Sequence, residues 1–184
     1  MHTQRKYSSD EVYLSILSPE HQPLLSAFFS CSVELNEYLK TDALAFQRLH
    51  LGVTYLLISK QGGKLISYLT LATGSLKIPD EKEFVLRGRR LGDYPKDFPR
   101  QFPALLIGKL ATDKREEGRG GAGLLLDYVV GIALGIRKSA GCSHLIAHAK
   151  ASPRVIDWYK HKGFRTDILN SSGRETIPLY LELP

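Results

Sequence analysis

The sequence predicts an α/β fold with a mixed central sheet, and three observations predict it. A continuous apolar run at 104–112, typical of a buried central strand, leads into a glycine-rich loop at 118–123. Apolar residues at helical spacing follow this loop, and a further strand-like run covers 144–149. Strand, loop, helix and strand form a βαβ unit, so the middle of the sheet should be parallel and the rest antiparallel.

The N-terminal half of the chain supplies the other elements of the sheet and its first helices. Residues 12–17 form an apolar run typical of a strand, and Ser18-Pro19 is a helix-start signal. Apolar residues at helical spacing predict a helix over about 33–48. The runs 53–58 and 65–71 flank a glycine-containing turn, which predicts an antiparallel hairpin.

The C-terminal half begins with an irregular connection. Residues 74–102 contain three prolines and several charges, and a connection of that length tends to be functional. The helix after the glycine loop is predicted to end at a C-cap near Gly141. Its predicted buried stripe is Leu125, Val129, Ile132 and Ile136. Ser152-Pro153 opens a short helix that stops at Gly163, and the runs 164–168 and 176–183 are expected to close the chain as strands.

Composition and charge bound the class of protein. With 184 residues, 43% of them hydrophobic, the chain fits one domain over 1–184. The 25 basic and 19 acidic residues give a net charge of +6, concentrated in residues 87–115 and 137–174. Such a surface attracts polyanions such as a phosphorylated cofactor or a nucleic acid, although a solvated basic face without a partner is the alternative. No apolar run spans about 20 residues and no signal sequence is recognised, so we expect a cytoplasmic protein that does not enter the membrane. Cys31 and Cys142 are expected to be reduced, and no metal site is expected.

The glycine loop indicates an anion site. Backbone without Cβ atoms can approach a ligand closely, and the helix that follows presents unpaired N–H groups, so a pyrophosphate suits this loop. Gly118, Gly120 and Gly123 satisfy the dinucleotide pattern G-x-G-x-x-G, but no acidic residue follows at the end of the next strand. The phosphate-binding P-loop pattern is also missing. A helix-packing glycine cluster without a ligand remains the alternative.

Residues 113–126 resemble the acetyl-CoA motif of the GNAT N-acetyltransferases, [QR]-x-x-G-x-[GA]. In the preferred alignment Gly120 and Ala122 are the small residues of the motif, and Glu117 stands where the family has Gln or Arg. An alignment that starts the motif at Arg115 restores the basic residue but shifts the following leucines by two positions. The resemblance implies the GNAT fold, with about six to seven strands and about four helices, and acetyl-CoA as co-substrate. The residues it implies in coenzyme binding are Leu110, Ala111, Thr112, Gly118, Arg119, Gly120, Gly121, Ala122 and Gly123.

Residues 158–164 are similar to the family's closing pattern [FW]-Y-x-x-x-G-F. In the family the tyrosine hydroxyl lies beside the coenzyme sulfur, so the resemblance implies that Tyr159 is the general acid that protonates the departing thiolate. The alternative is a core role, because Tyr159 and Val155 are four residues apart on one helix face.

Three further segments, 29–39, 68–72 and 103–113, resemble one branch of the family, the acetyltransferase toxins of bacterial toxin–antitoxin pairs. That resemblance implies the α-amine of aminoacyl-tRNA as acceptor and a ribbon-helix-helix antitoxin as partner. A homodimer is a further candidate assembly, and the sequence does not determine the oligomeric state. The basic cluster Arg87, Arg89 and Arg90 would then hold tRNA phosphates; alternatively these arginines are solvated or pair with Asp93 and Asp97. Two other functions stay open: acetylation of a small amine or of a protein, and a non-catalytic module that binds coenzyme A or nucleic acid.

Overall fold

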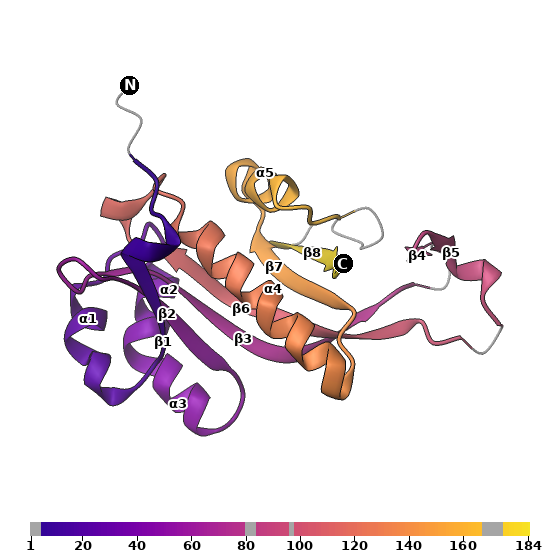
Figure 1. The fold of residues 1–184 in the computed structure, drawn as a ribbon, viewed down its shortest axis with the longest axis horizontal. Helices are drawn as coiled ribbons and strands as arrows, with labels where there is room; N and C mark the ends of the chain where they lie inside the picture. Colours follow the sequence, from indigo (N-terminus) through magenta and orange to yellow (C-terminus); the bar gives the residue numbers. More distant parts are fainter. Residues whose placement is uncertain (1–4, 80–83, 96–97, 167–174) are drawn as a thin grey trace. The chain divides into compact units, whose positions relative to one another are not determined.

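The computed structural model describes residues 5–79, 84–95, 98–166 and 175–184 (Figure 1). The strands are β1 (Val12–Ile16), β2 (Val53–Ser59), β3 (Leu65–Lys77), β4 (Val85–Leu86), β5 (Arg89–Arg90), β6 (Gln101–Thr112), β7 (His144–Lys150) and β8 (Thr176–Glu182). The helices are α1 (Gln22–Ala27), α2 (Val33–Glu37), α3 (Ala43–Arg48), α4 (Gly121–Ala140) and α5 (Pro153–His161). A π-helical turn, Tyr38–Asp42, joins α2 to α3 without a break, which confirms the predicted helix over about 33–48.

Six strands of the described chain form one sheet in the order β1-β2-β3-β6-β7-β8. The first hairpin is antiparallel, with Val53 opposite Leu71, and β1 pairs antiparallel with β2, with Val12 opposite Ser59. At the other end β8 runs antiparallel to β7, with His144 opposite Glu182. A separate two-stranded sheet joins β4 to β5. The mixed α/β fold is therefore confirmed, with α2 and α3 counted as one of four helices.

The chain divides into two compact units. The first unit comprises the described residues up to Ala72 together with Ile107–Val129, and the second comprises Thr73–Leu106 and Val130–Pro184. The chain passes from one unit to the other within β3, β6 and α4. That residues 1–184 form a single domain stays a prediction.

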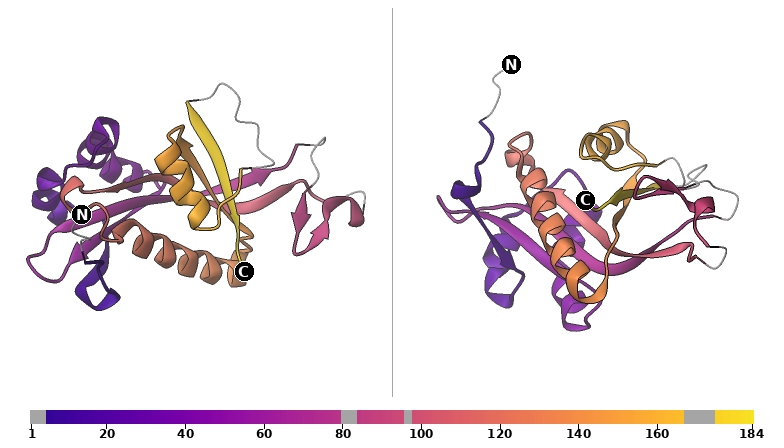
Figure 2. Two further views of the ribbon diagram at one scale, coloured as in Figure 1. Left: turned by 90° about the horizontal axis from the view of Figure 1, so that it is seen from above. Right: turned by 45° about the vertical axis from the view of Figure 1, so that its right-hand side comes forward.

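In the first unit, helices α1 to α3 cover one face of the strands, and the first turns of α4 cover the other (Figure 2). Tyr68 on β3 is fully buried here, packs edge-on against Phe28, and donates its hydroxyl proton to the carbonyl of Leu35, 2.7 Å away. The remaining buried members of this core are Leu17, Leu25, Tyr38, Leu39, Ala43, Leu56, Ile58, Leu65 and Ala111. The helical layer is thus fixed to the sheet by both apolar burial and a buried hydrogen bond.

The second unit is built on an aromatic core. The rings of Phe84, Phe102 and Tyr180 surround the imidazole of His144, with ring centroids 5.8–6.2 Å from it. His144 is fully buried; its Nδ1 lies 2.8 Å from the Ser143 hydroxyl, and its Nε2 has no hydrogen-bond partner among the described residues. Because burial penalises the charged imidazolium, the pKa of His144 is lowered to about 4.

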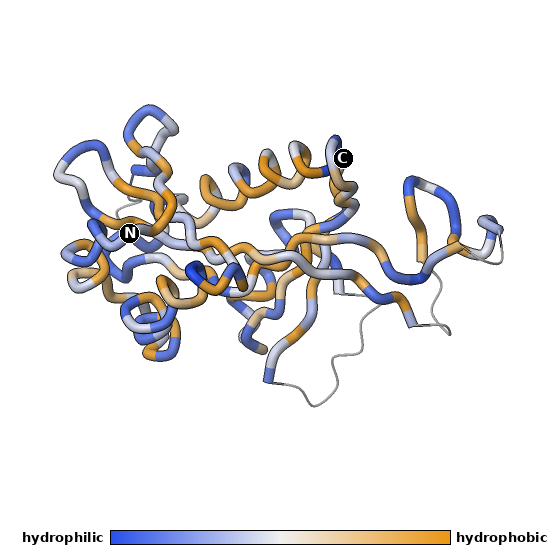
Figure 3. The backbone as a smooth tube through the Cα atoms, turned by 90° about the horizontal axis from the view of Figure 1, so that it is seen from below, coloured by the Kyte–Doolittle hydropathy of each residue, from blue (hydrophilic) through white to orange (hydrophobic). Residues whose placement is uncertain are grey.

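Several elements differ from the sequence-based prediction. The connection 74–102, predicted to be irregular, contains the end of β3, the β4–β5 hairpin and the start of β6. These strands continue because the segment has its own apolar core, which includes Leu76, Ile78 and Phe84. On α4, Figure 3 shows hydrophobic residues recurring on each turn.

The buried stripe of α4 is Leu125, Leu126, Val129 and Ala133, whereas Ile132 and Ile136 are only half-buried. The start signal at Ser18-Pro19 opens a short 3₁₀ turn, Pro19–His21, before α1. Of the strand expected at 164–168, Arg165 forms an isolated bridge with Tyr180, and 167–168 lie outside the described residues. None of the described helices combines the length and the apolar character that a membrane crossing requires.

The buried neutral His144 makes stability depend on pH. Between pH about 6.5 and about 4 the unfolded chain binds a proton that the folded chain excludes, so stability falls as the pH falls. The shift corresponds to a loss of up to roughly 3 kcal/mol. We expect His144→Phe to reduce this pH dependence and to be more stable than the native chain at pH 4.5. The measurement is the free energy of unfolding in urea from pH 7 to pH 4. The control is His148→Asn, which replaces an exposed histidine on the same strand. Equal pH dependence of the native and His144→Phe proteins would contradict the prediction.

Candidate functional site

A buried carboxylate fixes the chain where β6 ends. The side chain of Asp113 is 2% exposed and accepts the backbone N–H of Phe29 at 3.1 Å. Arg115 donates to the same carboxylate from its backbone N–H at 2.9 Å, from Nε at 2.8 Å and from Nη2 at 2.6 Å. The Nη2 group also donates to the carbonyl of Ala27, 2.7 Å away. Burial alone would raise the pKa of Asp113, but these hydrogen bonds together hold it below its ordinary value.

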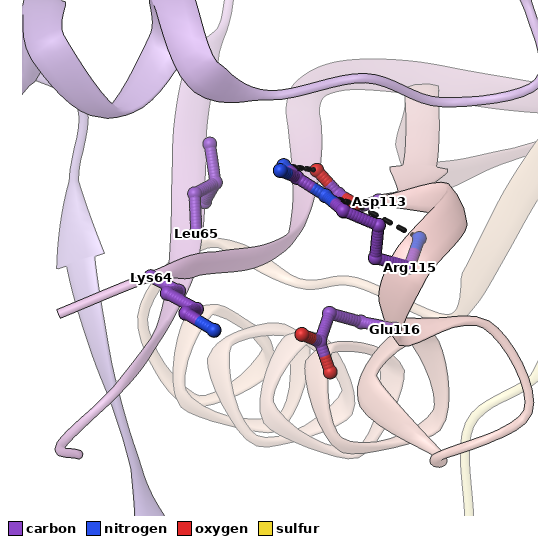
Figure 4. Close-up of a pocket in the computed structure, with 5 residues that line it drawn as sticks. All are labelled: Lys64, Leu65, Asp113, Arg115 and Glu116. Carbon is purple, nitrogen blue, oxygen red and sulfur yellow. Dashed lines mark hydrogen bonds and ion pairs between the residues drawn. The ribbon is translucent and has the colours of Figure 1, made fainter. Parts of the chain in front are cut away.

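A small pocket of about 90 Å³ adjoins this ion pair (Figure 4). It is lined by Lys64, Leu65, Asp113, Arg115 and Glu116. Figure 4 shows the guanidinium of Arg115 turned toward Asp113, with Lys64 and Glu116 on the other side. Its volume is well below the roughly 300–1,000 Å³ of ligand sites, and the two cations balance the two carboxylates. The pocket therefore does not accommodate a coenzyme.

The glycine loop follows this ion pair and opens α4. Gly118 and Gly120 have φ of 80° and 85°, a left-handed conformation that favours glycine. A Cβ on Gly118 would meet no atom within 4 Å, so the chain leaves space beside it. A Cβ on Gly121 would lie 2.7 Å from Cγ2 of Ile66 and 2.8 Å from Oγ of Ser67. The loop thus combines features of the two alternatives drawn from the sequence. Gly121 serves helix packing, and Gly118 leaves room just before a 20-residue helix, whose first N–H groups attract anions.

Two acidic residues just before this loop, Glu116 and Glu117, have partners. Glu116 accepts from Nη1 of Arg119 at 2.6 Å and from the hydroxyl of Tyr7 at 2.7 Å. Burial and the hydrogen bond to Glu116 raise the pKa of Tyr7 to about 12. Glu117 accepts from the thiol of Cys31, 3.2 Å away. The guanidinium of Arg119 is bound to Glu116, and its backbone carbonyl accepts the N–H of Tyr7 at 2.9 Å. Its predicted part in coenzyme binding stays a prediction.

The end of β6 carries the other predicted coenzyme contacts. Ala111 is buried in the core of the first unit, whereas Leu110 and Thr112 are half-buried. The hydroxyl of Thr112 lies 2.9 Å from that of Ser67 on β3. The predicted contacts involve the backbone of these residues, and they stay predictions.

Tyr159 lies in the second unit, on the last turn of α5, and is 5% exposed. Its ring packs edge-on against Trp158 and Phe164, with centroid distances of 4.9 and 5.0 Å. Gly163, at φ 88°, turns the chain so that the N–H of Phe164 bonds the carbonyl of Tyr159. Burial raises the pKa of Tyr159 well above its ordinary value, so the hydroxyl is protonated at neutral pH. Tyr159 is thus a core residue with a proton to donate.

The predicted tRNA-binding arginines lie on the β4–β5 hairpin of the second unit, where Arg87, Arg89 and Arg90 are all exposed. Figure 3 colours this hairpin as hydrophilic around its turn. Arg87 has φ 52°; its backbone N–H lies 3.0 Å and its Nε 3.6 Å from the Glu182 carboxylate. Arg89 lies over the ring of Tyr94 at 5.2 Å. The partner of Arg87 is therefore Glu182 rather than Asp93, and Asp97 lies outside the described residues.

Comparisons with known proteins give the fold a name. No protein-family model matches the chain. It is 27% identical over 126 residues to a tRNA-acetylating toxin of Mycobacterium tuberculosis (strain ATCC 25618 / H37Rv), covering 68% of this chain and 69% of the toxin. A tyrosine-to-phenylalanine variant of KacT superimposes with a TM-score of 0.76 at 19% identity, over 94% of this chain and 95% of that one. This chain has the fold of the GNAT acetyltransferase toxins.

A second such toxin, AtaT, has been solved with ligands. Its complex with acetyl-methionyl-tRNAfMet matches with a TM-score of 0.73 at 19% identity, over 94% of this chain and 95% of that one. Its complex with acetyl-CoA and the C-terminus of the antitoxin AtaR matches with a TM-score of 0.71 at 18% identity, over 95% and 94%. The resemblance drawn from the sequence motifs to the GNAT toxins is confirmed. The role of each residue stays a prediction.

No motif in the sequence had pointed to Tyr7, Glu116 or the partners of Asp113. Tyr7 and Glu116 are 109 residues apart, so no local spacing connects them. The Asp113–Arg115 pair did carry a signal, because both residues lie within the glycine-loop motif segment.

The packing role of Gly121 can be tested with a matched glycine on the same helix. We expect Gly121→Ala to destabilise the fold by about 1–3 kcal/mol, because its Cβ would overlap Ile66 and Ser67. Gly131→Ala, which meets nothing within 4 Å in mid-helix, should instead stabilise by about 0.5–1 kcal/mol. Chemical denaturation of both variants gives the comparison, and equal effects would show that Gly121 is not packed as described.

Proposed function

We propose that this chain is an acetyl-CoA-dependent N-acetyltransferase whose acceptor is the α-amine of aminoacyl-tRNA. The observation that carries the proposal is a glycine loop open at the start of α4, in a chain with the fold of toxins solved with acetyl-CoA and with acetylated tRNA. As the toxin of a toxin–antitoxin pair it would act in the cytoplasm, where charged tRNA is found. Its partners would be the tRNA and a ribbon-helix-helix antitoxin.

The loop suits the diphosphate of coenzyme A. The first N–H groups of α4 have no partner within the helix, and the positive end of the helix dipole favours negative charge there. Gly118 has open space beside it, so the backbone there can come close to phosphate oxygens, whereas the Lys6 side chain lies beside Gly120. Backbone groups of Leu110 and Thr112 would orient the pantetheine arm and polarise the acetyl carbonyl. The coenzyme supplies the thioester.

The chemistry requires no acyl-enzyme nucleophile, because the amine attacks the thioester directly. Burial raises the pKa of Cys142, which disfavours its thiolate, and the Cys31 thiol is bound to Glu117. As the amine forms its bond to carbon, the C–S bond breaks and sulfur leaves as thiolate. The Tyr159 hydroxyl donates the proton that the thiolate takes up, and the amine nitrogen releases its surplus proton to water. The phenolate regains a proton from solvent before the next turnover. A buried site raises the proton affinity of a thiolate as it does that of a phenolate, so the raised pKa of Tyr159 is compatible with this transfer.

The Tyr159 hydroxyl can be removed without removing the ring. We expect Tyr159→Phe to keep the fold and the affinity for coenzyme A, because both ring contacts remain. Turnover should fall on the order of 10²–10⁴-fold, the usual cost of losing general acid catalysis. The measurement is kcat for transfer from acetyl-CoA, with coenzyme affinity measured by calorimetry. Unchanged kcat would leave Tyr159 a packing residue only.

The acceptor and the arginines are tested together. Incubation with labelled acetyl-CoA and total aminoacylated tRNA should label aminoacyl-tRNA, and Arg87→Ala/Arg89→Ala/Arg90→Ala should weaken tRNA binding. Each lost phosphate contact should flatten the salt dependence by about 0.7–0.9 in log–log slope. The control Lys40→Ala/Arg48→Ala/Lys60→Ala removes the same charge from exposed positions elsewhere in the chain.

Two outcomes of this experiment contradict parts of the proposal. Labelling of a small amine or a peptide, with none on aminoacyl-tRNA, would replace the acceptor. If the two triple variants showed the same salt dependence, the arginine role would be lost while the acceptor remained.

A further inference from the structure

Residues 5–7, here called the N-terminal segment, lie on the glycine loop. The backbone N–H of Tyr7 donates to the carbonyl of Arg119 at 2.9 Å. The guanidinium of Arg119 lies 4.0 Å from the centroid of the Tyr7 ring and donates from Nε to the carbonyl of Arg5 at 3.3 Å. Figures 1 and 2 show the segment passing beside the turn that precedes α4. With the bond from Tyr7 to Glu116, four contacts hold this segment in place.

Lys6 is the residue of this segment that touches the glycines. Its Cβ, Cγ and Cδ atoms lie 3.9, 3.9 and 4.0 Å from the point that a Cβ on Gly120 would occupy. The aliphatic part of the side chain therefore runs along the loop in van der Waals contact. Lys6 is exposed, and its ammonium forms no ion pair or hydrogen bond with the residues that the structure describes.

Three arginines around the loop are already engaged. Arg5 pairs with Glu11 at 3.0 Å, Arg119 with Glu116 at 2.6 Å, and Arg115 with Asp113 at 2.6 Å. Each of these guanidiniums balances a carboxylate of the chain itself. A bound diphosphate would therefore draw on a cation that is not balanced in this way, and Lys6 lies against Gly120.

The motif around the loop lacks a basic side chain at one position. Glu117 stands where the related motif carries Gln or Arg, so the position that could assist an anion holds a negative charge instead. Glu116, beside it, is compensated by Arg119. A negative diphosphate next to Glu117 is unfavourable unless a positive charge lies nearby.

We propose that Lys6 binds the phosphates of the coenzyme and that Tyr7 holds it there. The Lys6 ammonium donates hydrogen bonds to phosphate oxygens above Gly120, in the place of the basic side chain that the loop lacks. Tyr7 positions it through its bonds to Glu116 and Arg119. This inference rests on the proposed function, because it assigns a further ligand to the same coenzyme.

The test is calorimetric titration of coenzyme A into the full chain and into Lys6→Ala. We expect affinity to fall about fivefold to tenfold, as for a charge-assisted hydrogen bond in a partly exposed position, and Lys6→Arg to retain most of it. Lys60→Ala, an exposed lysine on the β2–β3 turn, is the matched control and should bind as the native chain does. Tyr7→Ala should weaken binding as much as Lys6→Ala, although Lys6 is still present.

A second readout separates phosphate binding from general damage. Acetyl-pantetheine has no diphosphate, so its kcat/KM should be the same for the native chain and for Lys6→Ala, while kcat/KM for acetyl-CoA falls. Native affinity of Lys6→Ala for coenzyme A would overturn the inference, and tighter binding would show that the segment obstructs the loop. If the native chain itself binds no coenzyme A, the proposed function fails and this inference fails with it.

Discussion

The first unit depends on the hydrogen bonds that the buried carboxylate of Asp113 accepts. It receives hydrogen bonds from Phe29, just after α1, and from Arg115, just before the glycine loop. Removing the Arg115 side chain would leave a carboxylate that is 2% exposed without its ion-pair partner, which is far more costly than losing a surface pair. The direction in which the chain leaves β6, and hence the start of α4, is set by this one group.

The glycine loop built on that anchor meets two demands with different residues. Gly121 faces inward, where Ile66 and Ser67 leave no room for a Cβ, and it brings the first turn of α4 against β3. Gly118 and Gly120 both have positive φ; Gly118 leaves open space for a ligand, and Gly120 lies against the Lys6 side chain. Packing and anion binding therefore do not compete for one residue.

Several cationic side chains of this protein are already paired with carboxylates of the same chain. Arg119 is engaged by Glu116 and Tyr7, and Arg87 by Glu182, so formal charge overstates the number of cations free to bind phosphate. Tyr159 combines two roles, because its ring is buried in the core and its hydroxyl stays protonated at neutral pH. A function inferred from net charge alone would have missed both points.

The sequence by itself determined the elements whose signal is local. Helical spacing over 33–48 predicted α2–α3, because periodicity within one element reflects which face it buries. The two β-rich runs around the glycine-containing turn predicted β2 and β3, and the apolar run before the glycine loop predicted β6. It also located the loop and Tyr159. Only the tertiary structure decided that 74–102 continues as strands, that Arg87 pairs with Glu182, and that Tyr7 reaches Glu116. Those contacts join residues 95 and 109 positions apart, and such pairings depend on how the elements pack rather than on the residues beside them.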